Sequence, residues 1–202
     1  MSEEITELKI VNIYPNTINE CYISSPEEHL IKLIENGLGN CDEVLEMNEE
    51  LKNWLTHMPT FNEMPNINEY QNNYRRDDPD SHTNGVGKDF EKINVFLPTG
   101  QILFHGGNWF DSDPNKLKLT RYLSTSLGPA FASGGMHFDT IFIITIMSPD
   151  IKFYAFDPNL DGYSEAEVLI EKDVTLIKKS IRELIDRNGK KINVIYVEAY
   201  KK

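Results

Sequence analysis

Two glutamates, two residues apart, are the side chains of this sequence best placed to do chemistry. Glu165 and Glu167 lie in the stretch Gly-Tyr-Ser-Glu-Ala-Glu-Val-Leu-Ile at 162–170. The residues that follow them favour a strand, in which positions i and i+2 share a face. The strand rise then separates the two carboxylates by roughly 6.6 Å, and the apolar side chains at 166, 168 and 170 point to the core. Fixed carboxylates can stabilise a cationic sugar or activate an acceptor. The plainer alternative is a solvated edge strand with two ordinary glutamates.

Two earlier stretches also place polar side chains at the ends of apolar runs. His105 and Gly106 follow Ile-Leu-Phe at 102–104, and Gly107 comes next. Such a histidine can hydrogen-bond a ligand, and glycine lets that ligand approach the backbone closely. Three consecutive hydroxyls can hold a carboxylate or satisfy nearby backbone groups. They are Ser124, Thr125 and Ser126. Each stretch also has a structural explanation, as a strand end before a turn or before a helix cap.

In this order, about 20 and 40 residues apart, the three stretches resemble the motifs of the mono-ADP-ribosyltransferase family. The resemblance covers residues 90–202, with the motifs at 103–107, 123–127 and 164–170. The Ser-Thr-Ser and Glu-x-Glu motifs are the specific ones. The first motif departs from this branch, which usually has arginine where the chain has His105. Histidine at this position of the first motif is typical of the diphtheria-like toxins and the poly-ADP-ribose polymerases.

The resemblance implies a mixed, mostly antiparallel β-sandwich core, and together with the helical pattern before residue 90 it gives an α+β fold with an N-terminal helical part. Residues 89–202 would form the catalytic domain, and residues 1–88 an N-terminal strand, a helical region and a polar linker. Glu167 would stabilise the cationic ribose, and Glu165 would orient the acceptor. Cofactor-binding residues would be His105, Gly106, Ser124, Thr125 and Ser126. Tyr163 would lie in the loop that meets the substrate.

The implied activity is transfer of ADP-ribose from NAD to a protein acceptor, with an arginine side chain favoured and NAD hydrolysis as a side activity. NAD is the co-substrate and no metal is required. One alternative is an inactive NAD- or protein-binding module of the same fold. Another is a metal-dependent β-barrel enzyme using His105, His137 and the two glutamates, which the lack of a close His-x-His pair disfavours.

Composition limits the possible partners and compartments. The 202-residue chain has a net charge of −12, which argues against general affinity for nucleic acid or for an anionic membrane. A nucleic-acid acceptor is therefore less expected than a protein. Cys21 and Cys41 have no metal-type spacing and suggest reduced thiols. With no signal-peptide run and no apolar span, we expect a cytoplasmic protein, or a toxin or effector delivered into a host cytosol. The oligomeric state stays open.

The secondary-structure pattern changes near residue 90. Before it, we expect a strand at 8–14, a helix that starts at Ser-Ser-Pro 24–26 and ends at Gly37, a second helix at 42–57, and a polar loop at 66–88. After it, short β-type runs predict a mostly antiparallel assembly. These runs are at 102–104, 120–125, 140–147, 151–156, 166–170 and 192–199, with another favoured at 180–185. Asn188-Gly189 predicts a hairpin turn.

Overall fold

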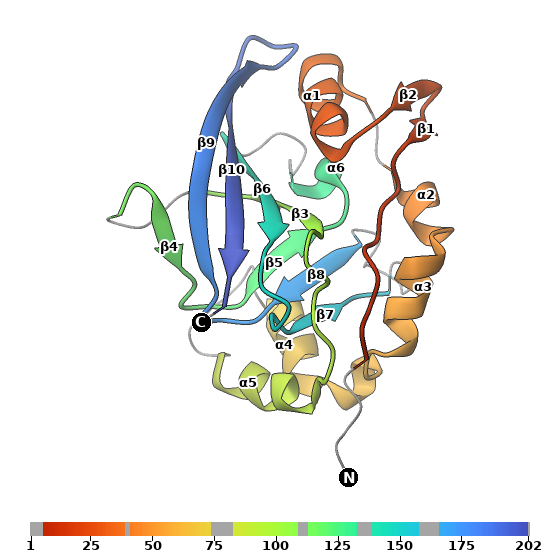
Figure 1. The fold of residues 1–202 in the computed structure, drawn as a ribbon, viewed down its shortest axis with the longest axis vertical. Helices are drawn as coiled ribbons and strands as arrows, with labels where there is room; N and C mark the ends of the chain where they lie inside the picture. The colour runs from red at the N-terminus through yellow and green to blue at the C-terminus, as the bar shows by residue number, and fades with distance from the viewer. Residues whose placement is uncertain are drawn as a thin grey trace.

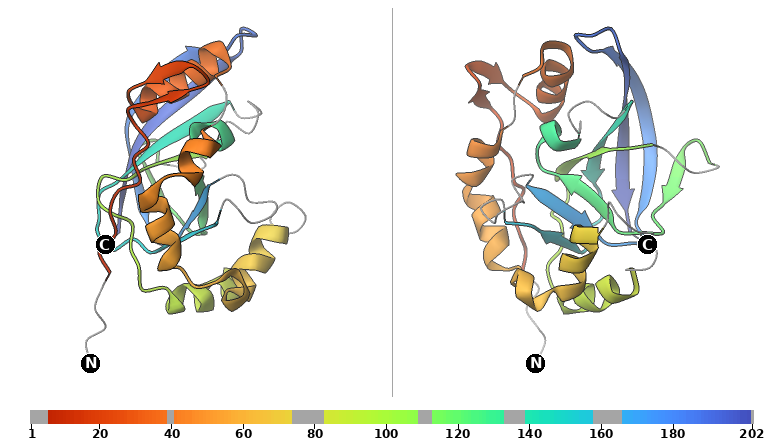
Figure 2. Two further views of the ribbon diagram at one scale, coloured as in Figure 1. Left: turned by 90° about the vertical axis from the view of Figure 1, so that its right-hand side faces the viewer. Right: turned by 180° about the vertical axis from the view of Figure 1, so that it is seen from behind.

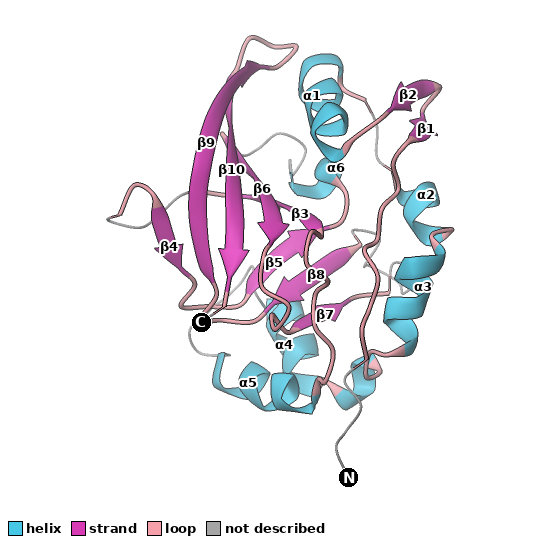
Figure 3. Cartoon of the chain, in the orientation of Figure 1, coloured by secondary structure: helices cyan, strands magenta, loops and turns pink. Residues whose placement is uncertain are grey.

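The computed structural model describes residues 6–38, 41–73, 83–108, 113–132, 139–157 and 166–201. Figure 3 shows helices and strands in these ranges. The helices are α1 (Pro26–Asn36), α2 (Asp42–Glu46), α3 (Glu49–Thr56), α4 (Pro65–Asn73), α5 (Thr83–Lys92) and α6 (Pro129–Ala132), with a 3-10 turn at Phe61–Glu63. The strands are β1 (Asn16–Ile18), β2 (Cys21–Ile23), β3 (Ile102–Gly106), β4 (Lys116–Lys118), β5 (Leu123–Ser126), β6 (Thr140–Ile146), β7 (Phe153–Ala155), β8 (Glu167–Ile170), β9 (Thr175–Ile185) and β10 (Lys191–Tyr200).

The main sheet has eight strands in the order β4-β9-β10-β6-β3-β5-β8-β7. Within this sheet the β6–β10 pair is parallel, and the other described strand pairs are antiparallel. Figure 1 shows β9 and β10 along the long axis of the molecule, whereas β5 and β8 run obliquely. The two halves meet where Phe104 pairs with Ser126. The α+β, mostly antiparallel fold expected from the sequence is confirmed, and in the described residues its main strands form one continuous sheet of eight.

Helix α1 forms as its sequence predicts. The Ser25 hydroxyl accepts a hydrogen bond from the Glu28 N–H, Pro26 occupies the first turn, and Gly37 ends the helix with a φ of 67°. Its apolar face packs on one face of the sheet. That contact joins Leu30, Leu33 and Ile34 to Leu184, Ile192 and Val194.

The N-terminal segment is extended, but the predicted strand at 8–14 is wrong. The Gln101 side chain takes the place of a strand partner, because its amide oxygen accepts from Val11 N at 2.9 Å and its amide nitrogen donates to Val11 O at 3.3 Å. The Trp54 indole N–H donates to Lys9 O at 2.8 Å. This segment therefore lies between the sheet and α3 (Figure 2).

The predicted helix at 42–57 is interrupted. The Asn48 side chain accepts from Glu50 N and Leu51 N, both at 3.0 Å, and so starts α3 as a new helix. An N-cap asparagine thus overrides the continuous apolar spacing on which the sequence prediction rested.

The loop predicted at 66–88 is also wrong in its described part, which forms α4 and α5. Asp89 is fully buried and accepts from Asn66 N at 2.8 Å and Ile67 N at 3.1 Å, so it caps α4 from α5. The 88/89 domain boundary falls within α5, and one apolar core contains residues from both sides of it. The division into two domains stays a prediction.

The β9–β10 hairpin is confirmed, but its turn is longer than a two-residue Asn-Gly turn. Ile185 pairs with Lys191, so the loop contains residues 186–190. Gly189 has a φ of 82°, and the Asp186 carboxylate accepts from Asn188 N and Lys190 N, both at 2.8 Å. An aspartate-centred turn therefore replaces the pair of positive φ angles expected from Asn-Gly.

Candidate active site

Glu167 begins β8, and β8 lies between β5 and β7. Its side chain is 3 % exposed, so the explanation as a solvated edge strand is wrong for this residue. All four residues of β8 are buried, so both faces are covered, not only the one predicted. A buried carboxylate is costly unless hydrogen bonds satisfy it. Glu165 and Tyr163 lie outside the described residues.

The strand alternation does not extend back through Ala166. Ala166 has a φ of +43°, which is unusual for a residue with a side chain, and is 2 % exposed. Its carbonyl accepts from Leu127 N at 3.2 Å. The predicted strand geometry of 166–170 therefore holds from Glu167 onward, and the inference that positions 165 and 167 share a face loses its basis. The sequence pattern carried no signal for this turn of the backbone.

Ser124 holds the carboxylate of Glu167. Its hydroxyl donates to Glu167 Oε1 at 2.6 Å, the short distance of a charge-assisted hydrogen bond. In the β5–β8 register, Ser124 pairs with Leu169 and Ser126 with Glu167, so this contact runs diagonally between two antiparallel strands. The expectation that the hydroxyl run can hold a carboxylate is met by Ser124.

The other two hydroxyls of the run contact the backbone. Thr125 Oγ1 donates to Val168 O at 2.6 Å and is buried between the strands. Ser126 Oγ accepts from Gly128 N at 3.1 Å, at the start of α6. These contacts fix the end of β5 and the chain that leaves it. A cofactor contact by Thr125 or Ser126 stays a prediction.

His105 lies near the end of β3 and contacts the backbone carbonyl of Ser124, the residue whose hydroxyl holds Glu167. Its Nδ1 lies 2.7 Å from Ser124 O. A carbonyl oxygen only accepts, so Nδ1 carries the proton and Nε2 has a free lone pair. Burial lowers the pKa of His105 below its ordinary value of 6.5, and the hydrogen bond to Ser124 opposes that shift only in part. His105 is therefore a neutral acceptor at pH 7.

Gly107 leaves room for the accepting nitrogen of His105. A Cβ on Gly107 would lie 2.8 Å from His105 Nε2, closer than real Cβ contacts. On its other side, the ring lies 5.7 Å from the ring of Phe142. Gly106 is the last residue of β3 and pairs with Ile141. The sequence indicated close backbone approach at these glycines, but not that Gly107 accommodates His105 itself.

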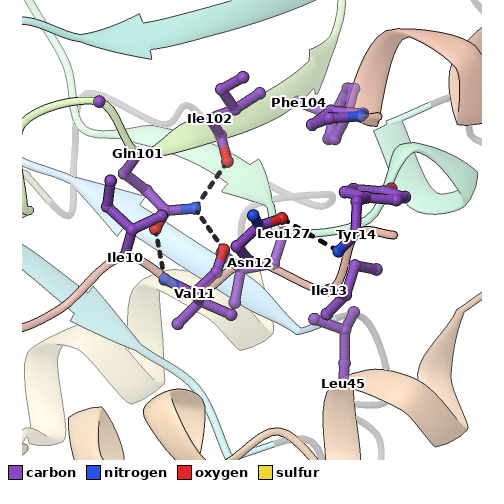
Figure 4. A pocket seen from close by; sticks show the side chains of 12 residues that line it. Ile10, Val11, Asn12, Ile13, Tyr14, Leu45, Gln101, Ile102, Phe104 and Leu127 are labelled. Carbon is purple, nitrogen blue, oxygen red and sulfur yellow. Dashed lines mark hydrogen bonds between the residues drawn. The ribbon is translucent and has the colours of Figure 1, made fainter. Parts of the chain in front are cut away.

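A cavity of about 190 Å³ lies elsewhere, between the N-terminal segment and β3. Figure 4 shows Ile13, Leu45, Phe104 and Leu127 around it, with the Gln101 amide bonded across to Val11. Its lining includes neither His105, nor Ser124, nor Glu167. This cavity is therefore separate from the candidate site.

Among the described residues, no three His, Cys, Asp or Glu side chains gather as a metal site would require. His137 and Glu165, two of the ligands in the metal-enzyme alternative, lie outside that part of the chain. No helix in the described ranges has the length and apolar character needed to cross a membrane.

The sequence matches no family model and no curated protein. Solved structures do match. BECa, an ADP-ribosylating toxin of a binary enterotoxin of C. perfringens solved with NADH, superposes with a TM-score of 0.55 at 14 % identity, over 74 % of this chain and 45 % of BECa. Plx2a, an ADP-ribosyltransferase toxin from Paenibacillus larvae, superposes with a TM-score of 0.54 at 16 % identity, over 74 % of this chain and 90 % of Plx2a. The ADP-ribosyltransferase Vis, solved with an inhibitor, superposes with a TM-score of 0.54 at 18 % identity, over 85 % of this chain and 89 % of Vis.

The chain therefore spans less than half of BECa but most of Plx2a and Vis. At these identities the likeness concerns the fold. The chain has the fold of ADP-ribosyltransferase toxins.

Proposed function

We propose that the chain is an NAD-dependent mono-ADP-ribosyltransferase that modifies a protein, as a toxin or effector acting in a host cytosol. The observation that carries this proposal is the buried Glu167 on β8, held by the Ser124 hydroxyl of the neighbouring strand β5 at 2.6 Å. The likeness of the fold to toxins with this activity supports it.

Glu167 is the proposed catalytic residue. In the reaction, the bond between the ribose and nicotinamide breaks, and its electron pair goes to the pyridine nitrogen. The ribose becomes cationic in the transition state, as in glycoside hydrolysis. A fixed carboxylate, shielded from water, stabilises that charge as it develops. The acceptor then bonds the ribose carbon and loses a proton, which Glu165 helps to transfer to solvent, and nicotinamide leaves as a neutral molecule.

His105 is proposed to bind a ribose hydroxyl. Its Nε2 can only accept a hydrogen bond while Nδ1–H is held by Ser124 O, and a hydroxyl supplies the donor. An arginine at this place would grip the dinucleotide phosphates in pairs of hydrogen bonds. Gly106 and Gly107 allow the dinucleotide to approach β3 closely. At this position the chain therefore binds a ribose hydroxyl through a neutral histidine, whereas the resembled branch has a cationic arginine.

Glu165 and Tyr163 complete the proposal on the acceptor side. A carboxylate beside the ribose suits a guanidinium, so the proposed acceptor is an arginine side chain, which Glu165 orients and helps to deprotonate. Tyr163 would contact the acceptor protein. Glu165→Gln should abolish transfer to a free guanidine such as agmatine and spare much of the NAD hydrolysis. Equal loss of both activities would show that the two glutamates do not divide these roles.

Release of nicotinamide from labelled NAD by the purified chain tests the proposal. We expect release in buffer alone, and faster release with agmatine. A chain that binds NAD but releases no nicotinamide under either condition would instead be the inactive binding module.

A further inference from the structure

We propose that the cavity beneath the N-terminal segment binds a small, uncharged, apolar molecule, of the size of one methyl-substituted benzene ring. The cavity has a volume of about 190 Å³ and lies between residues 10–14 and β3. An engineered cavity of about 150 Å³ lined by Leu, Ile and Phe side chains stays dry and binds benzene. The slightly larger volume here therefore accommodates a molecule of about six to eight non-hydrogen atoms. Binding at this place does not depend on the proposed function.

The wall of the cavity is apolar and uncharged. Figure 4 shows twelve lining residues, and none of these described residues is Asp, Glu, Lys, Arg or His. Eight of the twelve have apolar side chains: Ile10, Val11, Ile13, Pro26, Leu45, Ile102, Phe104 and Leu127. A charged group is strongly disfavoured in such surroundings because no opposite charge lies in the wall to pair with it. The ligand is therefore uncharged, which excludes a nucleotide.

The three polar side chains of the wall already bond to the protein itself. The Gln101 amide oxygen accepts from Val11 N at 2.9 Å, and its amide nitrogen donates to Val11 O at 3.3 Å. Asn12 Oδ1 accepts from Tyr14 N at 3.0 Å. The Tyr14 hydroxyl lies 2.6 Å from His29 Nδ1, and burial raises the pKa of Tyr14, so that its hydroxyl stays neutral. A polar ligand would lose its bonds to water and find little replacement for them, so the cavity favours an apolar one.

The cavity lies behind the candidate active site, on the opposite face of the sheet. Phe104 and His105 are neighbours on β3, and side chains alternate between the faces of a strand. Phe104 packs in the cluster that contains Leu30 of α1, whereas the His105 ring lies 5.7 Å from that of Phe142 on the other face. A molecule in the cavity would contact both β3 and the N-terminal segment, and would therefore hold that segment against the sheet.

Ile10 provides a path of entry. It lines the cavity and is 41 % exposed, so it lies where the cavity meets solvent. Exposed side chains change rotamer within picoseconds to nanoseconds. Entry of a small molecule therefore requires no unfolding of the segment that covers the cavity.

Thermal unfolding with toluene as the probe tests the proposal. In buffer saturated with toluene, the melting temperature of the wild type should rise by about 2–4 °C, because the native state alone has the cavity. Benzoate has a ring of the same size but a negative charge, and at the same concentration it should give no rise. Ile13→Phe fills the cavity and should abolish the rise with toluene. Ile177→Phe makes the same substitution at a 36 % exposed position of β9 outside the lining, and should keep it.

Methyl NMR of the wild type locates the probe without any substitution, and so decides the question even if Ile13→Phe does not fold. Toluene should shift the methyl signals of Ile13, Leu45 and Leu127 and leave that of Ile185, on the distant hairpin, unchanged. Absence of shifts at the three lining residues would overturn the proposal, and so would shifts at Leu169 beside the candidate site without them. A folded Ile13→Phe that keeps the full rise, or an equal rise with benzoate, would also overturn it.

Discussion

The Ser124 hydroxyl donates a 2.6 Å hydrogen bond to Glu167 Oε1, across two neighbouring strands. The same residue accepts a hydrogen bond from His105 through its backbone carbonyl. Ser124 therefore fixes an anionic group through its side chain and the tautomer of a neutral group through its backbone. Replacement of its side chain should disturb only the first of these contacts.

Ser124→Ala should lower kcat for nicotinamide release about 10- to 100-fold. The side-chain hydrogen bond to a charged group is worth about 1.5–3 kcal/mol, and its loss leaves the carboxylate of Glu167 less well oriented. Steady-state kinetics measure this effect. Ser124→Thr keeps the hydroxyl and should recover most of the rate. Full activity of the alanine variant would show that the hydrogen bond does not serve catalysis.

Thr125→Val should affect stability and spare kcat. Thr125 Oγ1 donates to Val168 O in a buried position, and valine has the same shape without the donor. The free energy of unfolding should fall by about 1 kcal/mol. Urea unfolding followed by circular dichroism measures it, with kcat determined in parallel. A large fall in kcat without any loss of stability would instead indicate that Thr125 contacts the substrate.

The KM for NAD should stay constant as pH falls from 8 to 6.5 and should rise only at lower pH. His105 must be neutral to accept a hydrogen bond, and burial lowers its pKa below 6.5. The unfolded chain binds that proton more readily than the native state, so native stability should also fall as pH drops below 6.5. A pH profile of KM, with His105→Asn as the control that lacks this titration, tests the point. A rise centred above pH 6.5 would contradict it.

Asp89→Asn should destabilise the fold by about 2 kcal/mol at pH 7, because hydrogen bonds to a buried charge are lost or weakened. Burial opposes ionisation of Asp89, but hydrogen bonds from Ile67 N, Lys92 Nζ and Asn66 outweigh it and lower its pKa below 3.8. This contribution is present above pH 3.8 and is lost as pH falls through the lowered pKa. Acid unfolding of the two proteins should therefore converge at low pH. A constant difference in stability at every pH would exclude a role for the charge.

The β-rich half of the chain is predictable because its signals are local. Apolar runs such as 140–147 and 192–199 are long enough to specify strands, and Pro26 with Ser25 specifies a helix start. The resemblance also singled out the hydroxyl run and Glu167 as site residues. Their shared contact depends on antiparallel register, which places residues 43 positions apart side by side.

The failures of prediction have a common physical cause, which is capping by distant or competing side chains. Asn48 ends a continuous helical pattern, and Asp89 stabilises a helix start 23 residues before it. The Gln101 side chain hydrogen-bonds the backbone of Val11, which lies 90 residues earlier in the chain. The left-handed Ala166 is likewise set by tertiary contacts of the chain around it. No window of local sequence contains the partners of Asp89 and Gln101, whereas the Asn48 cap is local and competes with the apolar spacing of the same window.

Nicotinamide release by the wild type and by Glu167→Gln tests the central claim most directly. Glutamine keeps the size of the side chain and its hydrogen bond from Ser124 but removes the charge. We expect at least a 100-fold loss of release, an unchanged circular dichroism spectrum, and wild-type activity in Glu46→Gln, where the glutamate is exposed on α2. Release by Glu167→Gln at the wild-type rate would contradict the account.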